Sequence, residues 1–236
     1  MYKKNKILAI TLARGGSKGV KNKNIINING KPLISYTIKE ANKSNYIDRY
    51  IVSTDSELIR KISIKYGADV PFLRPKKFAT DRATSVDALV QAVNWIEKND
   101  GQEYDIIIEL MCTNPLKNYF DIDNIIKKII NTKADSVIAM HKLEDHHPIR
   151  IKKIVNDRIE NFILKEIPET RRQDLKPPAY IRSGSIYALK RNHLMRDRLR
   201  YGSKNSRPYI LPESRAINID SLTDCYVAEK ILTNEK

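Results

Sequence analysis

The chain has 236 residues, and its 43 Lys and Arg against 28 Asp and Glu give a net charge of +15. Hydrophobic residues make up 41% and charged residues 30%, which excludes a disordered chain and leaves enough apolar area for a core. No apolar run approaches the ~20 residues that a membrane-spanning helix needs. The basic start before residues 7–13 partly matches a signal peptide, but no cleavage site follows. With only two cysteines, we expect a cytoplasmic protein without a membrane partner.

Strand and helix signals alternate along the first two-thirds of the chain. Short apolar runs predict strands, and apolar residues at helical spacing predict helices. The predicted strands are 7–12, 50–53, 70–73, 105–111 and 135–140, and the predicted helices are 32–43, 57–66, 85–97 and 121–130. This alternation predicts a Rossmann-like α/β fold, with a mostly parallel sheet and helices on both faces. Ligands bind such sheets at the carboxyl ends of the strands.

The pattern changes after residue 140. Residues 146–155, 158–164 and 179–189 have the pattern of antiparallel strands joined by charged, proline-containing loops. Residues 209–219 predict a further strand, interrupted at Pro212, and residues 222–232 predict a final helix. We therefore expect an inserted arm over 143–180, on a nucleotide-binding core made of 1–142 and 181–236.

The loop after the first strand is the strongest candidate for a binding site. The adjacent glycines Gly15 and Gly16 let backbone N–H groups approach an anion, and Arg14, Lys18 and Lys23 add positive charge. The loop matches neither the Walker A motif nor G-x-G-x-x-G. Because it follows a strand, we expect it to hold a triphosphate; the alternative is a basic surface turn.

Nine blocks of sequence span nearly the whole chain in a fixed order: 14–24, 29–33, 51–55, 73–75, 79–85, 113–116, 146–148, 172–173 and 217–220. Together they resemble the acylneuraminate cytidylyltransferases, the CMP–sialic acid synthetases. The resemblance implies a nucleotidyltransferase that turns CTP and a nine-carbon 2-keto sugar acid (a nonulosonic acid such as sialic, legionaminic or pseudaminic acid) into the CMP-sugar and pyrophosphate. An eight-carbon keto acid of the ketodeoxyoctonate type is the alternative acceptor.

The resemblance also implies roles for individual residues. The expected catalytic cations are Arg14, Lys18 and Lys23, and the expected nucleotide-binding residues are Ala13, Gly15, Gly16, Asn24, Arg74 and Ser85. The expected sugar-binding residues are Met111, Thr113, Arg150 and Arg172. The last two lie in the arm, which in this family crosses to the partner subunit of a homodimer. Without the family, Arg172 has an equally good interpretation as a solvated surface residue.

The sequence departs from the family pattern at two places. The family's two metal-binding aspartates are here Asn218 and Asp220, which a strand would place on one face. We expect Asp220, with Asn218 as a neutral oxygen donor, to bind Mg²⁺ or Mn²⁺; the alternative is that Asp220 only caps the final helix. Met111 replaces a glutamine that often contacts the acceptor, so we expect altered sugar recognition unless Met111 is a core residue.

A dense basic tract covers residues 190–207, with seven Lys and Arg against one Asp. Such a tract, with the net charge, raises the alternative of a nucleic-acid-binding protein. The tract has no zinc-finger spacing, aromatic RNA-binding motif or basic-region heptads, and the tyrosines are dispersed. We therefore expect a solvated surface and no nucleic-acid partner.

Overall fold

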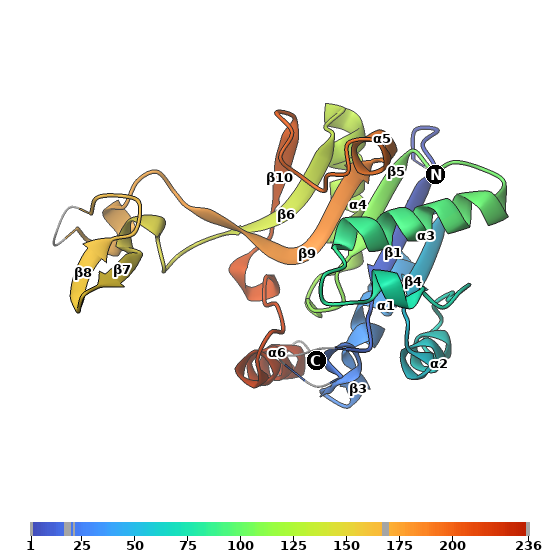
Figure 1. The fold of residues 1–236 in the computed structure, drawn as a ribbon, viewed down its shortest axis with the longest axis horizontal. Helices are drawn as coiled ribbons and strands as arrows, with labels where there is room; N and C mark the ends of the chain where they lie inside the picture. The colour runs from blue at the N-terminus through green and yellow to red at the C-terminus, as the bar shows by residue number, and fades with distance from the viewer. Residues whose placement is uncertain (1, 17–19, 21, 167–169, 235–236) are drawn as a thin grey trace.

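The computed structural model describes residues 2–16, 20, 22–166 and 170–234. In this part of the chain, six strands form a central sheet in the order β10–β6–β9–β5–β1–β4 (Figure 1). Their bounds are β1 Ile7–Leu12, β4 Arg49–Ser53, β5 Ile106–Leu110, β6 Ser136–Lys142, β9 Tyr180–Lys190 and β10 Ser206–Ile210. All run parallel except β9, which pairs antiparallel with both β5 and β6.

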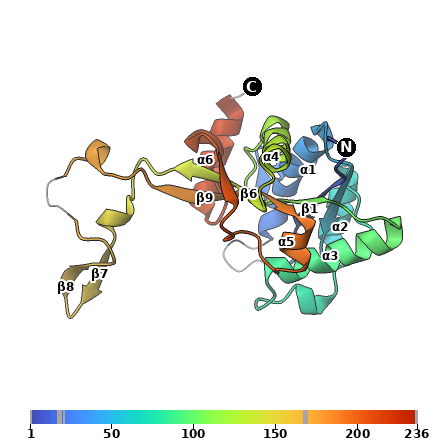
Figure 2. The same cartoon turned by 90° about the horizontal axis from the view of Figure 1, so that it is seen from above.

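Helices cover both faces of this sheet. The bounds are α1 Leu33–Lys43, α2 Glu57–Lys65, α3 Ser85–Asp100, α4 Tyr119–Thr132, α5 Arg191–Met195 and α6 Leu222–Asn234. Alternate residues of β1 point to opposite faces: Ile7 packs with α1 and α4, whereas Leu8 packs with α3. Figure 2 shows α1 and α4 on one side of the sheet and α3 and α5 on the other. The predicted fold class is confirmed.

Side-chain hydrogen bonds cap the first turns of α2 and α3. The Ser56 hydroxyl accepts a hydrogen bond from the Ile59 amide at the start of α2. Thr84 and Asp87 form a capping box at the start of α3. Each contact satisfies backbone N–H groups that have no partner within the helix. A short hairpin of β2 (Asn27–Ile28) and β3 (Lys31–Pro32) precedes α1. No helix in the described residues has the length and hydrophobicity to cross a membrane.

Four strand predictions are wrong in part. The strand expected over 158–164 covers only Arg158–Asn161, and proline explains the other three differences. Residues 70–73 make only one isolated bridge, between Leu73 and Thr54, because Pro71 cannot donate to a strand ladder. The strand expected over 209–219 ends with β10 at Ile210, and a 3-10 helix, Glu213–Arg215, follows Pro212. Residues 146–151 hold a 3-10 helix that begins at Pro148, so the strand β7 covers only Lys152–Val155.

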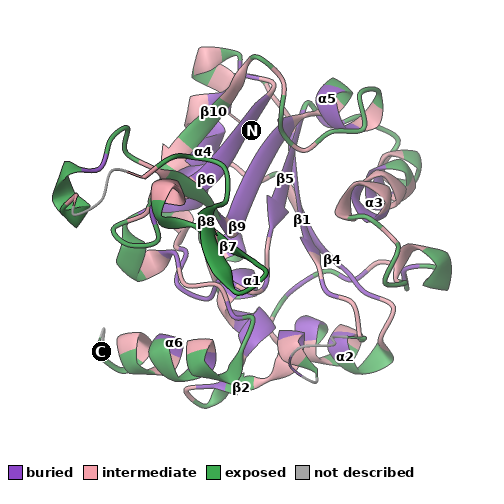
Figure 3. Cartoon of the chain, turned by 60° about the vertical axis from the view of Figure 1, so that its left-hand side comes forward, coloured by how far each residue is buried: buried purple, intermediate pink, exposed green. Residues whose placement is uncertain are grey.

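Residues 143–179 leave the sheet between β6 and β9 and stand clear of it (Figure 1). They carry a hairpin of β7 and β8 (Arg158–Asn161). Figure 3 colours this hairpin as exposed. Apolar side chains of the hairpin and of the three residues after it are at least 46% exposed, although water is an unfavourable environment for them: Ile154, Ile159, Phe162, Ile163 and Leu164. None of the described residues of the arm belongs to the two buried hydrophobic clusters on either side of the sheet.

Candidate active site

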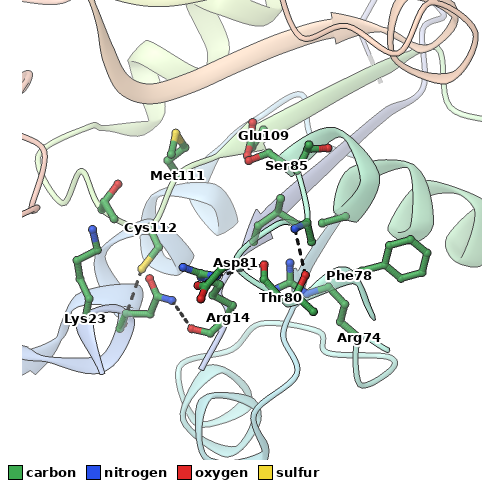
Figure 4. A pocket seen from close by; sticks show the side chains of 16 residues that line it. Arg14, Lys23, Arg74, Phe78, Thr80, Asp81, Ser85, Glu109, Met111 and Cys112 are labelled. Carbon is green, nitrogen blue, oxygen red and sulfur yellow. Dashed lines mark hydrogen bonds and ion pairs between the residues drawn. The ribbon is translucent and has the colours of Figure 1, made fainter. Parts of the chain in front are cut away.

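A cleft of about 440 Å³ lies at the carboxyl ends of β1 and β5, where a parallel sheet binds its ligands. Figure 4 shows the side chains that line it. Seven of the predicted site residues are among them: Arg14, Lys23, Asn24, Arg74, Ser85, Met111 and Thr113. The fold thus gathers residues that lie up to 99 positions apart in the sequence, from Arg14 to Thr113, around one cavity.

The described part of the loop after β1 is held in place by hydrogen bonds. The Gly15 amide donates to Asp55 Oδ1 over 2.9 Å, and Asn24 Nδ2 donates to the Arg14 carbonyl over 2.9 Å. A Cβ on Gly15 would lie 3.1 Å from that of Ser56, which is tighter than an ordinary van der Waals contact, so glycine eases this close approach. Of the other predicted loop residues, Gly16 has room for a side chain, since an added Cβ would meet no atom within 4 Å. Ala13 is fully buried away from the cleft, and Lys18 lies outside the described residues.

Two arginines give the cleft its positive charge. Arg14 Nη1 lies 2.9 Å from Asp81 Oδ1 and donates to the Thr80 carbonyl, which draws its side chain toward the loop before α3 (Figure 4). Arg74 is only 5% exposed and donates from Nη2 to the Ser53 carbonyl. Burial lowers the pKa of Arg74, and the nearby Asp55 carboxylate opposes that shift. A guanidinium nevertheless stays protonated at physiological pH.

Lys23 connects the loop to the segment before α6. Its ammonium lies 2.8 Å from Asp220 Oδ1, and Asn218 Nδ2 donates to Asp220 Oδ2. This segment is irregular, so the strand alternation expected there is wrong, yet the two side chains still meet. The Asp224 amide donates to the Ser221 hydroxyl at the start of α6. The helix is therefore capped by Ser221, and the alternative in which Asp220 acts as the cap is wrong.

The oxygen atoms near Asp220 fit a magnesium ion. Asn218 Oδ1 is buried with no hydrogen-bond partner, and the amide nitrogen of the same side chain contacts the Asp220 carboxylate. Carboxylate and amide oxygens are hard donors, and Mg²⁺ completes its octahedron with water and phosphate. The described residues contain no group of three or more His, Cys, Asp or Glu that could hold a metal by themselves. The donor set therefore suits a metal that also binds a phosphorylated substrate.

Gly184 is a functional candidate that no sequence pattern indicated. It lies in β9 at φ +60°, and a Cβ there would stand 3.1 Å from Asn218 Oδ1. Only glycine adopts this backbone conformation easily and leaves room for the amide. The Ile219 amide also donates to the Thr113 carbonyl over 2.7 Å. These contacts bring the Asn218–Asp220 segment to the end of β5.

The three residues after β5, Met111–Thr113, also line the cleft. Met111 lines the cleft and also packs against the core on the α3 side. Its role in sugar recognition stays a prediction. Cys112 is 2% exposed, and burial raises the pKa of its thiol to about 12. Lys117 lies behind this loop and donates to the Met111 carbonyl over 2.7 Å. A protonated thiol is a poor nucleophile, so Cys112 is not suited to covalent catalysis in this cleft.

The two predicted arm residues do not reach this cleft within one chain. Arg150 donates to the Thr170 carbonyl over 2.9 Å and lies 3.7 Å from Glu166, both in the arm. Arg172 begins a 3-10 helix of the arm and is exposed. Neither lines the cleft. Sequence analysis also missed three acidic residues at the cleft: Asp55, Asp81 and Glu109. Of these, Glu109 had a signal, since it is a charged residue inside an apolar strand.

The basic tract is extensively paired with carboxylates. The pairs are Lys190–Asp135 (3.1 Å), Arg191–Glu97 (2.8 Å), Arg196–Asp197 (2.6 Å), Arg200–Glu109 (2.7 Å) and Arg198–Asp87. Neutralised cations contribute little to the phosphate binding that dominates nucleic-acid affinity. The tract is therefore a surface crossed by ion pairs, which does not favour a nucleic-acid-binding function.

Comparisons with known proteins agree with this geometry. A family model described as "Cytidylyltransferase" matches residues 8–209. The chain is 33% identical to a pseudaminic acid cytidylyltransferase of Campylobacter jejuni, over 95% of each chain. It is 32% identical to a CMP-N,N'-diacetyllegionaminic acid synthase of the same species, over 96% of this chain and 95% of the relative.

Among solved structures, the fold resembles a CMP:2-keto-3-deoxy-manno-octonic acid synthetase complexed with CTP. The TM-score is 0.73 at 19% identity, over 98% of this chain and all of the other. This likeness concerns the fold, whereas the family match and the relatives concern the sequence. The match over residues 8–209, with full-length relatives above 30% identity, shows that the chain belongs to the cytidylyltransferase family of nucleotidyltransferase enzymes.

Proposed function

We propose that the protein transfers the cytidylyl group of CTP to a nonulosonic acid, giving a CMP-nonulosonic acid and pyrophosphate. The observation that carries this proposal is the cleft at the strand ends, which gathers Arg14, Lys23 and Arg74 in a member of the cytidylyltransferase family. CTP and a keto sugar acid are both anions, and a cationic cleft attracts and holds them. The named relatives act on pseudaminic and legionaminic acids, which are nine-carbon acids of this kind.

The proposed reaction is one displacement at the α-phosphorus of CTP. The anomeric hydroxyl of the sugar acid forms the new P–O bond, its proton is released, and the bond to pyrophosphate breaks. Positioning and charge neutralisation supply most of the catalysis in such transfers. Arg14 and Lys23 offset the charge that develops on the phosphoryl oxygens, while Asn24, Arg74 and Ser85 hold the nucleotide. No covalent enzyme intermediate is required, which agrees with the buried Cys112 thiol.

We also propose a Mg²⁺ requirement, with Mn²⁺ as a substitute. Asp220, with Asn218 as a neutral donor, would hold the ion beside Lys23. The ion would supply further charge neutralisation at the triphosphate. Lys23, which already contacts the Asp220 carboxylate, keeps that side chain turned toward the loop.

We also propose a cytoplasmic site of action. The absence of a disulfide framework supports it.

A homodimer is the proposed working form. The exposed apolar side chains of the β7–β8 hairpin suit burial against a second copy, and the hairpin stands clear of its own core. Arg150 and Arg172 would then reach the cleft of the partner subunit, where an arginine can bind the sugar carboxylate through two hydrogen bonds. This arrangement completes each site with residues from both chains.

Complementation tests the shared site. Lys23→Ala damages the cleft, and Arg172→Ala damages the arm, so each homodimer should be poorly active. Co-expressed chains should form heterodimers in which one of the two sites has an intact cleft and an intact arm. Activity should then recover to about a quarter of the wild-type value per chain, because half of the dimers are mixed and each has one good site. No recovery would contradict the cross-subunit arrangement.

Pyrophosphate release tests the activity itself. The full chain is incubated with CTP, Mg²⁺ and a panel of neuraminic, legionaminic, pseudaminic, deaminated neuraminic and eight-carbon keto acids. We expect turnover with a nine-carbon acid and with CTP in preference to other nucleotides. Turnover with the eight-carbon acid alone would replace the proposed acceptor with the ketodeoxyoctonate type. A folded protein that binds CTP and uses none of these acids would contradict the proposed function.

A further inference from the structure

One buried ion pair of the basic tract reaches the cleft. Glu109 Oε2 accepts a hydrogen bond from Arg200 Nη1 over 2.7 Å, and the Glu109 side chain is only 2% exposed. Glu109 lines the cleft, whereas Arg200 does not. A carboxylate inside a protein is costly unless it is paired, and Arg200 is the structural counterpart of this one. The remaining pairs of the tract lie outside the cleft.

Aromatic rings hold Arg200 in position. Its guanidinium lies 4.7 Å from the centre of the Tyr187 ring, which is 6.5 Å from the ring of Tyr201. Arg182 stacks on the other tyrosine, 4.3 Å from the centre of the Tyr201 ring. Such cation–π contacts favour the charged guanidinium and restrict its orientation. The Glu109 carboxylate is therefore presented to the cleft in a fixed position before any ligand binds.

The place of Glu109 along the cleft wall points to its ligand. Glu109 and Met111 are two residues apart in an extended segment, since the Met111 amide continues the pairing with β9 by donating to the Ser185 carbonyl. They therefore face the same side, roughly 7 Å apart. Thr113 follows at the other end, next to the segment that carries Asp220. This side of the cleft thus runs from Thr113, beside the proposed reacting end of the acceptor, to Glu109.

We propose that Glu109, oriented by Arg200, recognises a hydrogen-bond donor on the part of the sugar acid remote from the reacting carbon. This inference rests on the proposed function. An ionised carboxylate only accepts hydrogen bonds, and it has about four acceptor positions, of which Arg200 uses one oxygen. A hydroxyl group satisfies it directly. An amide N–H satisfies it as well, whereas a carbon that bears only hydrogen leaves the buried carboxylate without a ligand partner. The acceptor class is therefore a nonulosonic acid with a hydrogen-bond donor, a hydroxyl or an amide N–H, at this position.

Two acceptors that differ at one carbon test the assignment. Deaminated neuraminic acid has a hydroxyl at carbon 5 where its 5-deoxy analogue has only hydrogen, and kcat/KM is measured for both with saturating CTP. We expect the wild type to prefer the hydroxyl compound by about tenfold to hundredfold, the range of a hydrogen bond to a charged group. In Glu109→Gln and Glu109→Leu this preference should fall below about threefold, because both remove the negative charge.

Control variants separate recognition from folding. Glu97→Gln breaks an ion pair with Arg191 in the same tract outside the cleft, and it should leave the preference unchanged. Arg200→Met should weaken the preference, mainly through KM for the acceptor, and Arg200→Lys should restore part of it, as expected of a positioning residue. An unchanged preference in folded Glu109 variants would overturn the inference and leave the proposed function intact.

Base recognition is the competing role for Glu109. Figure 4 shows Glu109 in the same region of the cleft as Ser85, which is expected to contact the cytidine. If Glu109 instead contacts the base, its variants should change the ratio of kcat/KM for CTP and UTP and leave the preference between the two acids unaltered. That result would also overturn the inference. A wild type that uses neither this pair nor any other acid would remove the proposed function and the inference together.

Discussion

Replacing Lys23 with alanine is the sharpest test of the proposed chemistry. Lys23 lines the cleft, its side chain is 19% exposed, and its ammonium lies 2.8 Å from Asp220 Oδ1. The charge therefore sits where the triphosphate and the metal-binding segment would meet. We expect Lys23→Ala to lower kcat strongly, since the ammonium is assigned to charge that develops as pyrophosphate leaves.

The structure separates the expected effect on turnover from the effect on stability. Loss of one preorganised charge at the transition state costs about a hundredfold to a thousandfold in kcat. Asp220 is 67% exposed, so the ion pair that is lost with Lys23 contributes less than about 1 kcal/mol to folding. In a domain of this size, that corresponds to a fall in Tm of no more than roughly 2–4 °C.

The assay measures pyrophosphate release at saturating CTP and acceptor, together with thermal unfolding of each variant. Lys43→Ala is the matched control, since Lys43 pairs with Glu40 over 2.7 Å on α1, outside the cleft. It should lose a similar amount of stability and keep wild-type turnover. If Lys23→Ala retains a kcat within threefold of the wild type, Lys23 does not act on the transition state and the reasoning is refuted.

Three further predictions follow from the same geometry. Gly184→Ala should lower Tm and weaken Mg²⁺ activation, because the new Cβ would strain a φ of +60° and press on Asn218 Oδ1 at 3.1 Å; an unchanged Mg²⁺ titration would contradict this. Asp220→Asn should raise the Mg²⁺ concentration for half-maximal activity by about tenfold or more, and no shift would exclude it as a ligand. Iodoacetamide at pH 8 should leave Cys112 unmodified in the folded protein, since a pKa of about 12 leaves a thiolate fraction on the order of 10⁻⁴; rapid alkylation, detected by mass spectrometry, would contradict this.

Local sequence signals predicted most of the core elements. Apolar runs located β1, β5 and β6, and the Ser56 cap located the start of α2. Three of the four strand errors occurred at Pro71, Pro148 and Pro212, where apolar character was given more weight than the missing N–H donor. The order of the strands could not be derived, because the position of β9 between β5 and β6 depends on long-range pairing.

The candidate site was predicted in part. Motif residues such as Arg14 and Lys23 were found because they lie in one continuous loop that resembles a known family. Glu109 and Gly184 were missed, since their roles arise from contacts with Arg200 and Asn218, which lie 91 and 34 positions away in the sequence. Such partners become visible only when the fold brings these distant segments together.

The most direct test of the account identifies the product. The full chain is incubated with CTP, Mg²⁺ and a nine-carbon acid that carries ¹³C at the anomeric carbon, and ³¹P and ¹³C NMR follow the reaction. The account predicts free pyrophosphate and a single new phosphodiester whose phosphorus couples to the labelled carbon. A labelled carbon that never couples to phosphorus, while CTP is consumed or stays intact, would contradict the central claim.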